Sequence, residues 1–298
     1  MVMDSVKYET REIEVISNRL ETDIFSSPNS VKIINDKFIS RVNGERLSDI
    51  LQTAGGIFLK SYGNASLQTV SINGLGAEHT IILLNGSRLS SYQNSQYDLS
   101  LIPKEVITRI EILYDGASSM YGSEALGGVI NVITKPEKYD KLITMGAGYG
   151  SYNEKNYFVK LQKRINNLSY NLNFNNESSQ NNYDFLYTSG QSTIKKQREN
   201  SDYKFNNLDL NIFYQLQKSS LLSYYTNYVS QDRNLPGIET GSEVSHSKQK
   251  DFNWNNSLQY EYIFNKNANF KYYLNYQNNL TKYTDANLIN SYYKNLVY

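Results

Sequence analysis

The second half of the chain alternates between apolar and polar residues over long segments. In "NLDLNIFYQL" (207–216), every second residue is Leu, Ile or Tyr, and most of the residues between them are polar. The same alternation recurs in residues 157–162, 168–175, 258–264 and 270–276. Because successive side chains of a strand point to opposite faces, this period of two predicts strands with one apolar and one polar face.

The connections between these strands alternate between short and long. "INN" (165–167), "QKS" (217–219) and "NKN" (265–267) have the length of tight turns, whereas residues 176–203 and 233–250 are expected to be long polar loops. Short turns at one end and long loops at the other are typical of an outer-membrane β-barrel, and tyrosine-rich strand ends suit its interfacial girdles. The strands of a soluble β-sandwich also alternate between apolar and polar residues, so a sandwich is the alternative fold.

The first 135 residues follow a mixed pattern. "NGERLSDILQTAGGI" (43–57) predicts a short helix in which Leu47, Ile50 and Leu51 share one face and glycine ends the element. "TVSINGLG", "TIILLNGSRL" and "ITRIEIL" predict short strands, and "IPKEV" predicts one helical turn that begins at Pro103. The fold class expected is an α+β domain followed by antiparallel transmembrane β-strands that form part of an outer-membrane β-barrel.

Composition narrows the function classes. The mean hydropathy is −0.57, and no apolar run approaches the roughly 18 residues of a membrane-spanning helix. The net charge of +1 gives no strong field for nucleic acid, so no nucleic-acid partner is expected. With no Cys and only two His, His79 and His246, we expect no disulfides, no thiol chemistry and no metal site built from thiolates or histidines.

Small residues crowd the stretch "RIEILYDGASSMYGSEALGGVINVITK" (109–135) between two aliphatic runs. A phosphate-binding loop is one explanation, but "GASSMYGSE" has no Lys after its last glycine to reach a phosphate. The dinucleotide fingerprint also fails, because the tight spacing of its glycines is absent. A tightly packed domain that sits inside another structure is the remaining explanation.

The same stretch closely resembles the plug domain of TonB-dependent outer-membrane receptors, nearest to the cobalamin and colicin I receptor branches. "VSINGLG", "IILLNGSRL" and "SLIPKEVITRIEILYDGASSMYGSEALGGVINVITK" carry the resemblance, which covers about residues 12–135. It implies that the glycines permit close backbone packing, as expected at Gly116, Gly122, Gly127 and Gly128. Asn73 and Asn85 stand where the family usually has charged residues. Candidates for contacts between plug and barrel are Arg88, Arg109, Glu111 and Glu124.

Near the start, "REIEVISNRLE" (11–21) resembles the energy-coupling box of the same family. The resemblance implies a box formed by Glu12, Ile13, Glu14, Val15, Ile16 and Ser17. Such a segment binds a TonB-type periplasmic energy-coupling protein by adding a strand to the edge of its sheet. The alternative is an ordinary first strand of the plug.

The resemblance also implies a small-molecule ligand, such as an iron–siderophore complex or cobalamin, bound by plug apices and outer loops. The candidate segment is "SRLSSYQNSQYD" (87–98), and the residues expected to contact substrate are Arg88, Tyr92, Gln93, Asn94, Gln96 and Tyr97. Loops 176–203 and 233–250 would add to the pocket, and the basic cluster Lys195, Lys196 and Arg198 would suit an anionic ligand. The alternative is an ordinary polar loop. The resemblance implies no covalent chemistry, so we expect no enzyme, no catalytic residues, no cofactor and no metal site.

The expected domains are an N-terminal segment with the coupling box (1–19), a plug (20–135) and a partial barrel (136–298) of about seven or eight strands. Family barrels have about 22 strands, and an eight-stranded barrel is too narrow to hold a plug. We therefore expect a fragment or truncated form of a receptor for active nutrient uptake. It is expected to lie in the Gram-negative outer membrane, in contact with the membrane lipid. Alternatives are a structural or adhesive outer-membrane β-protein without energy coupling, or a non-functional remnant of a broken receptor gene.

Overall fold

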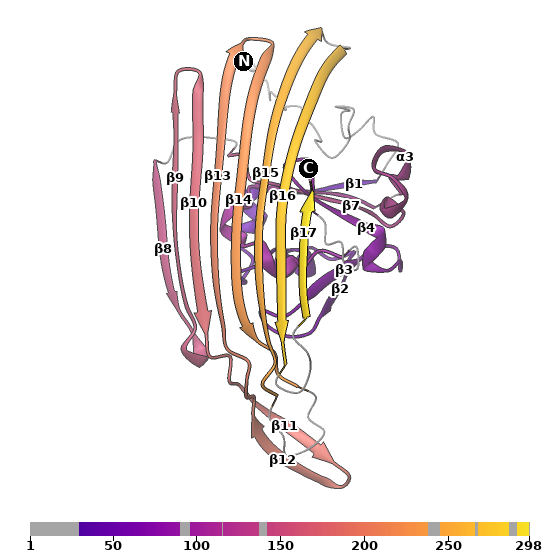
Figure 1. Cartoon of the computed structure of the whole chain (residues 1–298), viewed down its shortest axis with the longest axis vertical. Coiled ribbons are helices and arrows are strands. Elements are labelled where there is room, and N and C mark those ends of the chain that lie inside the picture. The colour runs from indigo at the N-terminus through magenta and orange to yellow at the C-terminus, as the bar shows by residue number, and fades with distance from the viewer. Residues whose placement is uncertain are drawn as a thin grey trace, which may run out of the picture.

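The computed structural model of the chain describes residues 30–89, 96–114, 116–136, 142–237, 245–265, 268–285 and 291–297. Residues 30–136 form a mixed α+β unit, here called the plug, and residues 142–297 form a large curved sheet, here called the wall. Figure 1 shows the long strands of the wall standing side by side, with the plug against one of its faces.

The plug consists of short elements joined by tight connections. Its strands are β1 (Val31–Ile34), β2 (Phe58–Ser61), β3 (Gln68–Ser71), β4 (Thr80–Leu84), β5 (Ser87–Leu89), β6 (Arg109–Leu113) and β7 (Gly128–Ile133). Its helices are α1 (Asp36–Ile39), α2 (Leu47–Ala54) and α3 (Ser118–Tyr121), with 3-10 turns η1 (Ala77–His79), η2 (Leu99–Leu101), η3 (Lys104–Val106) and η4 (Ser123–Ala125). No helix in the described part of the chain is long and apolar enough to cross a membrane.

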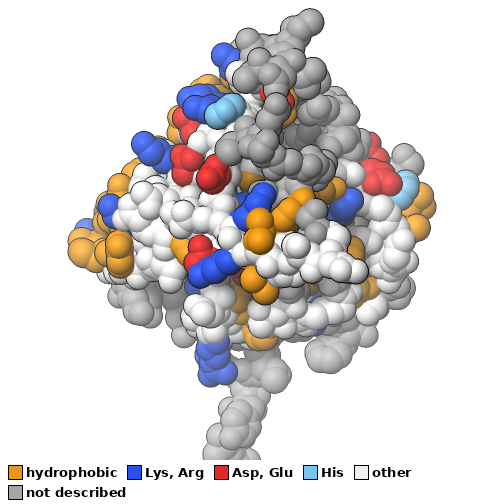
Figure 2. Space-filling model, turned by 90° about the horizontal axis from the view of Figure 1, so that it is seen from below, with side chains coloured by type: hydrophobic (Ala, Val, Ile, Leu, Met, Phe, Trp, Pro, Cys, Tyr) orange, Lys and Arg blue, Asp and Glu red, His pale blue; other side chains and the backbone are white. Residues whose placement is uncertain are grey.

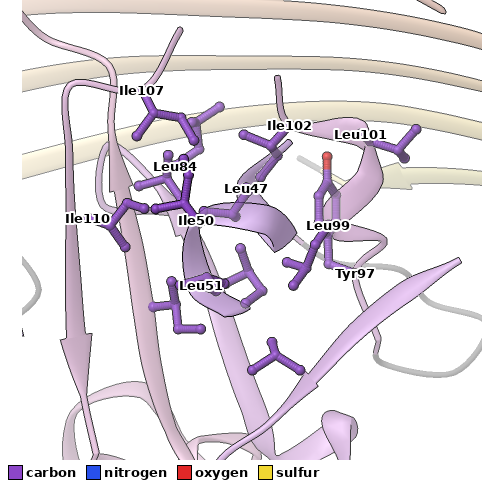
Figure 3. Packing of buried hydrophobic residues seen from close by; sticks show 14 of the residues in the cluster. Leu47, Ile50, Leu51, Leu84, Tyr97, Leu99, Leu101, Ile102, Ile107 and Ile110 are labelled. Carbon is purple, nitrogen blue, oxygen red and sulfur yellow. The ribbon is translucent and has the colours of Figure 1, made fainter. Parts of the chain in front are cut away.

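A five-stranded sheet in the order β1-β6-β7-β4-β5 forms the centre of the plug, and β2 and β3 form a separate ribbon. All neighbouring strands of the sheet are antiparallel except β4 and β7. The main hydrophobic core lies between this sheet and α2, as Figure 3 shows for Leu47, Ile50 and Leu51 of the helix. These three side chains are fully buried, which confirms the face predicted from their spacing.

Local sequence explains where α2 begins and ends. The Asp49 carboxylate accepts hydrogen bonds from the backbone N–H groups of Glu45 (2.9 Å) and Arg46 (3.0 Å), which fixes the first turn. Gly55 follows the last helical residue with φ 71°, a left-handed conformation that glycine adopts without strain. The predicted single turn after Pro103 is also confirmed, as η3.

Two glycines of the small-residue stretch have different reasons for being glycine. At Gly128, φ is 147° and a Cβ atom would collide with the backbone carbonyl of Leu113, so the predicted close packing is confirmed there. At Gly122, φ is 90° but no atom lies within 4 Å of a Cβ position. The expectation of close packing at Gly122 is therefore wrong, and the conformation of the turn that ends α3 requires the glycine instead.

The wall is an antiparallel sheet of eight strands in the order β17-β16-β15-β14-β13-β10-β9-β8. Its strands are β8 (Ile143–Tyr149), β9 (Lys155–Ile165), β10 (Leu168–Ser179), β13 (Tyr203–Gln217), β14 (Ser220–Asn234), β15 (Lys248–Asn265), β16 (Ala268–Thr284) and β17 (Ser291–Val297), with the 3-10 turn η5 (Ser151–Asn153). Apart from one inserted hairpin, each strand pairs with its neighbour in the sequence.

The two faces of the wall have opposite polarity. On β13 the side chains of Asn207, Asp209 and Asn211 are buried, whereas Leu208 is 43% exposed and Leu210 is half-buried. The polar face therefore lies inward against the plug and the apolar face lies outward. A soluble sandwich would bury the apolar face, so this arrangement agrees with transmembrane strands of a barrel wall.

The wall has a turn end and a loop end. Short turns join β9 to β10 and β13 to β14 at the turn end, as predicted. The longer connections, 180–202 and 235–247, lie at the loop end. The first of these was predicted to be a polar loop, but it holds a two-stranded hairpin, β11 (Asp184–Ser189) and β12 (Ser192–Gln197). Figure 1 shows this hairpin projecting beyond the wall.

Candidate functional site

A pocket lies at the loop end, where the β2–β3 loop of the plug meets the wall. It is a small hollow, partly open to solvent. The plug contributes residues 62–66, and the remaining lining residues come from the loop end of the wall: Asn181, Tyr183, Arg198, Ser201, Tyr203, Arg233, Asn234 and Pro236. Figure 2 views the molecule from this end, where basic and acidic side chains lie among polar atoms.

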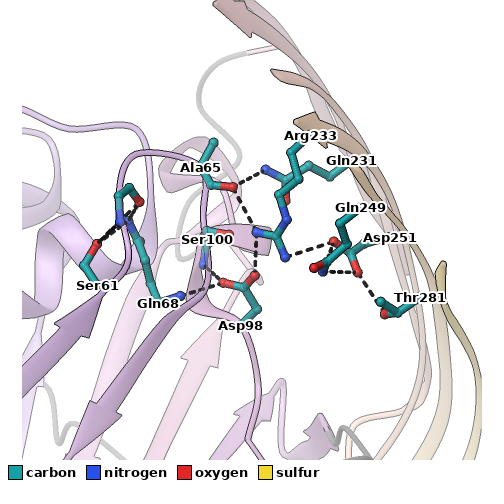
Figure 4. Close-up of polar contacts among 11 residues, drawn as sticks. Ser61, Ala65, Gln68, Asp98, Ser100, Gln231, Arg233, Gln249, Asp251 and Thr281 are labelled. Carbon is teal, nitrogen blue, oxygen red and sulfur yellow. Dashed lines mark hydrogen bonds and ion pairs between the residues drawn. The ribbon is translucent and has the colours of Figure 1, made fainter. Parts of the chain in front are cut away.

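Arg233 on β14 joins the wall to the plug beside this pocket (Figure 4). Its Nη1 lies 2.9 Å from a carboxylate oxygen of Asp98 in the plug, and its Nη2 lies 3.0 Å from Asp251 on β15. Nη1 also donates a hydrogen bond to the carbonyl oxygen of Ala65, at 2.9 Å. One guanidinium therefore holds the plug loop, the plug carboxylate and the neighbouring wall strand together.

Further hydrogen bonds fix both carboxylates. Asp98 Oδ1 accepts from the backbone N–H groups of Gln68 (3.1 Å) and Ser100 (3.0 Å), so two segments of the plug orient it. Asp251 Oδ1 accepts from the Thr281 hydroxyl at 2.8 Å. These ion pairs and hydrogen bonds compensate the burial of the arginine and of the two carboxylates. We call Asp98, Arg233 and Asp251 the apical clamp.

A second buried ion pair joins plug and wall through an arginine of the plug. Arg46 Nη2 lies 2.6 Å from Glu177 on β10, and both side chains are at most 5% exposed. The Arg46 guanidinium also lies 3.8 Å from the ring centroid of Phe205 on β13, within cation–π range. The Tyr203 hydroxyl donates to Glu177 at 2.5 Å, which completes this contact.

Two plug carboxyls lie close to this second pair. Asn175 of the wall donates a hydrogen bond to Glu105 Oε2 at 3.2 Å. Burial, followed by the nearby negative charge of Glu45, raises the pKa of Glu105 to about 7. Burial and Glu177 likewise raise the pKa of Glu45. Glu105 therefore changes charge near neutral pH at the contact between plug and wall.

Three of the residues predicted to contact substrate are among those that the structure describes, and they lie in three different environments. Arg88 forms an ion pair with Glu124, and its carbonyl accepts a hydrogen bond from Gln277 of β16. Gln96 is half-buried and donates to Glu78 at 3.4 Å. Tyr97 is 8% exposed and packs in the plug core, a position that favours packing over substrate contact. The other predicted residues, Tyr92, Gln93, Asn94 and the coupling box Glu12, Ile13, Glu14, Val15, Ile16 and Ser17, lie outside the described residues.

The sequence analysis named Arg88, Arg109, Glu111 and Glu124 as candidates for contacts between plug and wall, and the carbonyl of Arg88 does accept a hydrogen bond from Gln277 of the wall. Arg88 pairs with Glu124 and Arg109 pairs with Glu111 at 2.9 Å, so both pairs join plug residues to each other. Arg46 and Arg233, which the sequence analysis did not single out, form two ion pairs that cross between plug and wall in the described part of the chain. Their partners are far away in the sequence, where no local pattern could have identified them.

The chemistry of the site is binding chemistry. Within the described residues, no group of three or more His, Asp or Glu side chains is arranged to hold a metal ion. The pocket instead presents three tyrosines, several amides and two guanidiniums, which provide aromatic contact and hydrogen bonds.

Comparison with known proteins agrees with this architecture. Residues 23–129 match the family model of the TonB-dependent receptor plug domain. The curated vitamin B12 transporter BtuB of Vibrio cholerae serotype O1 is 31% identical over 140 residues, which are 47% of this chain and 23% of that protein. The BtuB of Photobacterium profundum is 28% identical over 137 residues, 46% of this chain and 23% of that protein. The match to these relatives thus spans about a quarter of their length.

Solved structures share the fold at lower sequence identity. The siderophore receptor PiuA from Acinetobacter baumannii aligns with a TM-score of 0.68 and 20% identity, over 88% of this chain and 38% of that one. The pyoverdine-bound FpvA of P. aeruginosa aligns with a TM-score of 0.73 and 14% identity, over 90% of this chain and 36% of that one. Plug and wall strands thus share one arrangement with these proteins. Residues 23–129 of the chain thus match a TonB-dependent receptor plug domain, and plug and wall together have the fold of these solved receptors.

Proposed function

We propose that the chain takes part in active uptake of a scarce nutrient, which binds in the pocket at the loop end. The observation that carries this proposal is that plug and wall line the pocket together, with Arg233 both lining it and pairing with Asp98 of the plug. A ligand there would contact both units, so its binding could change how the plug is held.

The ligand belongs to one of two classes under this proposal. Curated relatives are named as vitamin B12 transporters, and several solved structures of the same fold are named as siderophore receptors. Cobalamin-like compounds and iron–siderophore complexes are therefore the two classes to test. The apical segment 87–98 would add contacts, with Arg88 and Gln96 as its described candidates.

Energy coupling is part of the proposal. A TonB-type periplasmic protein would bind the box at residues 12–17 by strand addition and transmit force from the inner membrane to the plug. We also propose that further strands complete the wall. Within the described residues, β8 and β17 each pair with a single neighbouring strand, and eight strands are too few to enclose a plug.

The test uses the full-length receptor that carries this chain, expressed in a Gram-negative strain without its own high-affinity uptake systems. Radiolabelled cyanocobalamin and radiolabelled iron–siderophore complexes are offered with and without a protonophore. One ligand class should accumulate in energised cells, while the protonophore should abolish accumulation and leave surface binding intact. Absence of binding and uptake for both classes would contradict the proposal.

A further inference from the structure

Arg46 of the plug meets the wall in a cluster of charged groups in which the acids outnumber the cations. The cluster lies where α2 and η3 of the plug approach β9, β10 and β13 of the wall. We call it the acidic cluster, formed by the acids Glu45, Asp49, Glu105, Glu154, Glu177 and Asp209, the cations Arg46, Lys104 and Lys160, and the hydroxyl of Tyr203.

The cations of the acidic cluster contact other groups than Glu105. Arg46 Nη2 lies 2.6 Å from Glu177, and Lys104 Nζ donates to the carbonyl oxygen of Val42 at 3.1 Å. The charge of Lys160 is shared, because it attracts both Glu105 and Asp209. Within the described part of the chain, no cation forms a direct ion pair with Glu105, whose Oε2 accepts from the neutral amide of Asn175 instead.

These surroundings favour the protonated form of Glu105. A buried carboxylate without a direct counter-ion is unfavourable, and binding a proton relieves the cost. Burial, followed by the negative charge of Glu45, raises the pKa of Glu105 to about 7, and the weaker effects of Lys104 and Arg46 oppose this rise. Burial and the charge of Glu177 also raise the pKa of Glu45 and of Glu154. The docked plug therefore holds a proton that an ordinary glutamate releases.

This extra proton links the contact between plug and wall to pH. With the plug docked, Glu105 ionises near pH 7, whereas a hydrated Glu105 ionises near its ordinary value of 4.5. The docked form binds more protons between these values, so docking is favoured at low pH and weakens as pH rises through about 7. Loss of the proton also adds a negative charge beside Glu45.

We propose that the acidic cluster is a pH-sensitive switch in the contact between plug and wall. A proton on Glu105 keeps α2 and η3 docked on β10 and β13, and loss of the proton releases this side of the plug from the wall. The cluster lies near the loop end, since Glu154 belongs to the β8–β9 connection and Glu177 is close to the end of β10 at Ser179. The half-buried Glu45 and Glu154 give protons of the surrounding medium access to it.

The test measures the distance between plug and wall by double electron–electron resonance in the purified full-length receptor, without ligand. Residues 1–298 contain no Cys. Thr53→Cys on α2 and Lys204→Cys on the outward face of β13 therefore place two spin labels at exposed positions, once any cysteine elsewhere in the receptor is replaced by serine.

The distance distribution should depend on pH in the wild type. At about pH 5.5, where Glu105 keeps its proton, we expect a single narrow distribution. At about pH 8.5, where Glu105 is ionised, the distribution should become about twofold wider and extend to longer distances. A narrow distribution at both pH values would overturn the switch.

Two variants assign the effect to Glu105. Glu105→Gln has the shape of the protonated side chain and cannot ionise, so it should keep the narrow distribution at both pH values. Glu78→Gln is the matched control, because it makes the same change at an exposed position of the plug, where Glu78 interacts with His79 and Gln96. The control should broaden as the wild type does.

The remaining outcomes decide against the switch. Equal broadening in the wild type and Glu105→Gln would assign the pH response to other groups. Broad distributions in Glu105→Gln at both pH values would show that a neutral side chain at this position does not hold the plug. Loss of the pH response in Glu78→Gln would show that the effect is not specific to the acidic cluster.

Discussion

Arg233 of the wall lies 2.9 Å from Asp98 of the plug, although 135 residues separate them in the sequence. The side chains are 4% and 9% exposed, so water screens their charges little. The same arginine reaches Asp251 on the next strand at 3.0 Å. At the apical clamp, one wall arginine thus joins the plug to two neighbouring wall strands.

Replacing this arginine should loosen the plug. Arg233→Ala leaves two buried carboxylates without a counter-ion, and loss of one partner of a buried pair costs about 3–5 kcal/mol. We expect the plug of the full-length receptor to become sensitive to trypsin at a lower urea concentration. Lys250→Ala is the control, because Lys250 pairs with Asp232 where both are more than half exposed, and such pairs contribute about 0–1 kcal/mol. Equal sensitivity of both variants would contradict a special role for the clamp.

Two tyrosines of the apical segment should respond differently to truncation. Tyr97 is buried in the plug core, so Tyr97→Ala should destabilise the plug by about 3–5 kcal/mol, like other large core truncations. Tyr92→Ala should instead weaken ligand affinity by about 1 kcal/mol with unchanged stability, if Tyr92 contacts substrate as the sequence predicts. Urea midpoints and ligand titrations on both variants distinguish the roles. Wild-type affinity in Tyr92→Ala would assign the binding to other residues.

The raised pKa of Glu105 predicts a pH dependence of stability. The folded plug keeps the Glu105 proton up to a pH of about 7, whereas the unfolded chain loses it near 4.5. The native state therefore binds more protons in this window, and stability falls as pH rises from about 4.5 to 7. The contribution of this group is about 1–3 kcal/mol.

Glu105→Gln should remove the part of the pH dependence of stability that Glu105 contributes. Urea midpoints of the wild type and the variant, measured across the same pH window, give the difference. Glu45 lies in the same cluster with its pKa raised in the same direction, so part of the slope should persist in the variant. Parallel pH profiles for the two proteins would show that Glu105 does not titrate there.

The coupling box predicts a separation of binding from transport. Val15→Pro removes a backbone donor and fixes φ, which should prevent strand addition to the partner. Cells with the full-length variant should bind ligand at their surface as wild type does, while energised uptake should fall to the level seen with a protonophore. Val15→Ala keeps the backbone donor and should transport normally. Undiminished uptake in Val15→Pro would place the coupling segment elsewhere.

The periodic parts of the fold could be read from the sequence because each depends on local physics. The alternation of apolar and polar residues, as in Leu208, Asp209 and Leu210, predicts which side chains lie on which face of a strand. In a barrel wall one face contacts lipid and the other faces the plug. The helix that carries Leu47, Ile50 and Leu51 could be predicted from its spacing in the same way. The β11–β12 hairpin was missed although "DFLYTSGQSTIKK" has both alternation and a glycine turn, because its polarity suggested a loop.

The candidate site could be predicted only in part from the sequence. Of the basic hairpin residues named from the sequence, Arg198 lines the pocket, whereas the apical segment 87–98 stays a prediction. The arginines that join plug and wall were not predicted. Arg46 and Arg233 find their acidic partners 131 and 135 residues away respectively, and charge composition carries no information about such distant pairing. Tyr97 was predicted to contact the ligand because nothing about a tyrosine in a polar segment indicates that its side chain is buried.

The strand order of the wall sets the order in which the chain can assemble. Wall strands pair with neighbours in the sequence, so hairpins such as β13–β14 close short loops and can form early. Contacts between plug and wall close far longer loops: Ser87 bonds Ser257 across 170 residues, and Gln277 bonds Arg88 across 189. Because the entropy of closing a loop grows with its length, these bonds should form last. We therefore expect the plug to dock late, after β15 and β16 have been synthesised and paired.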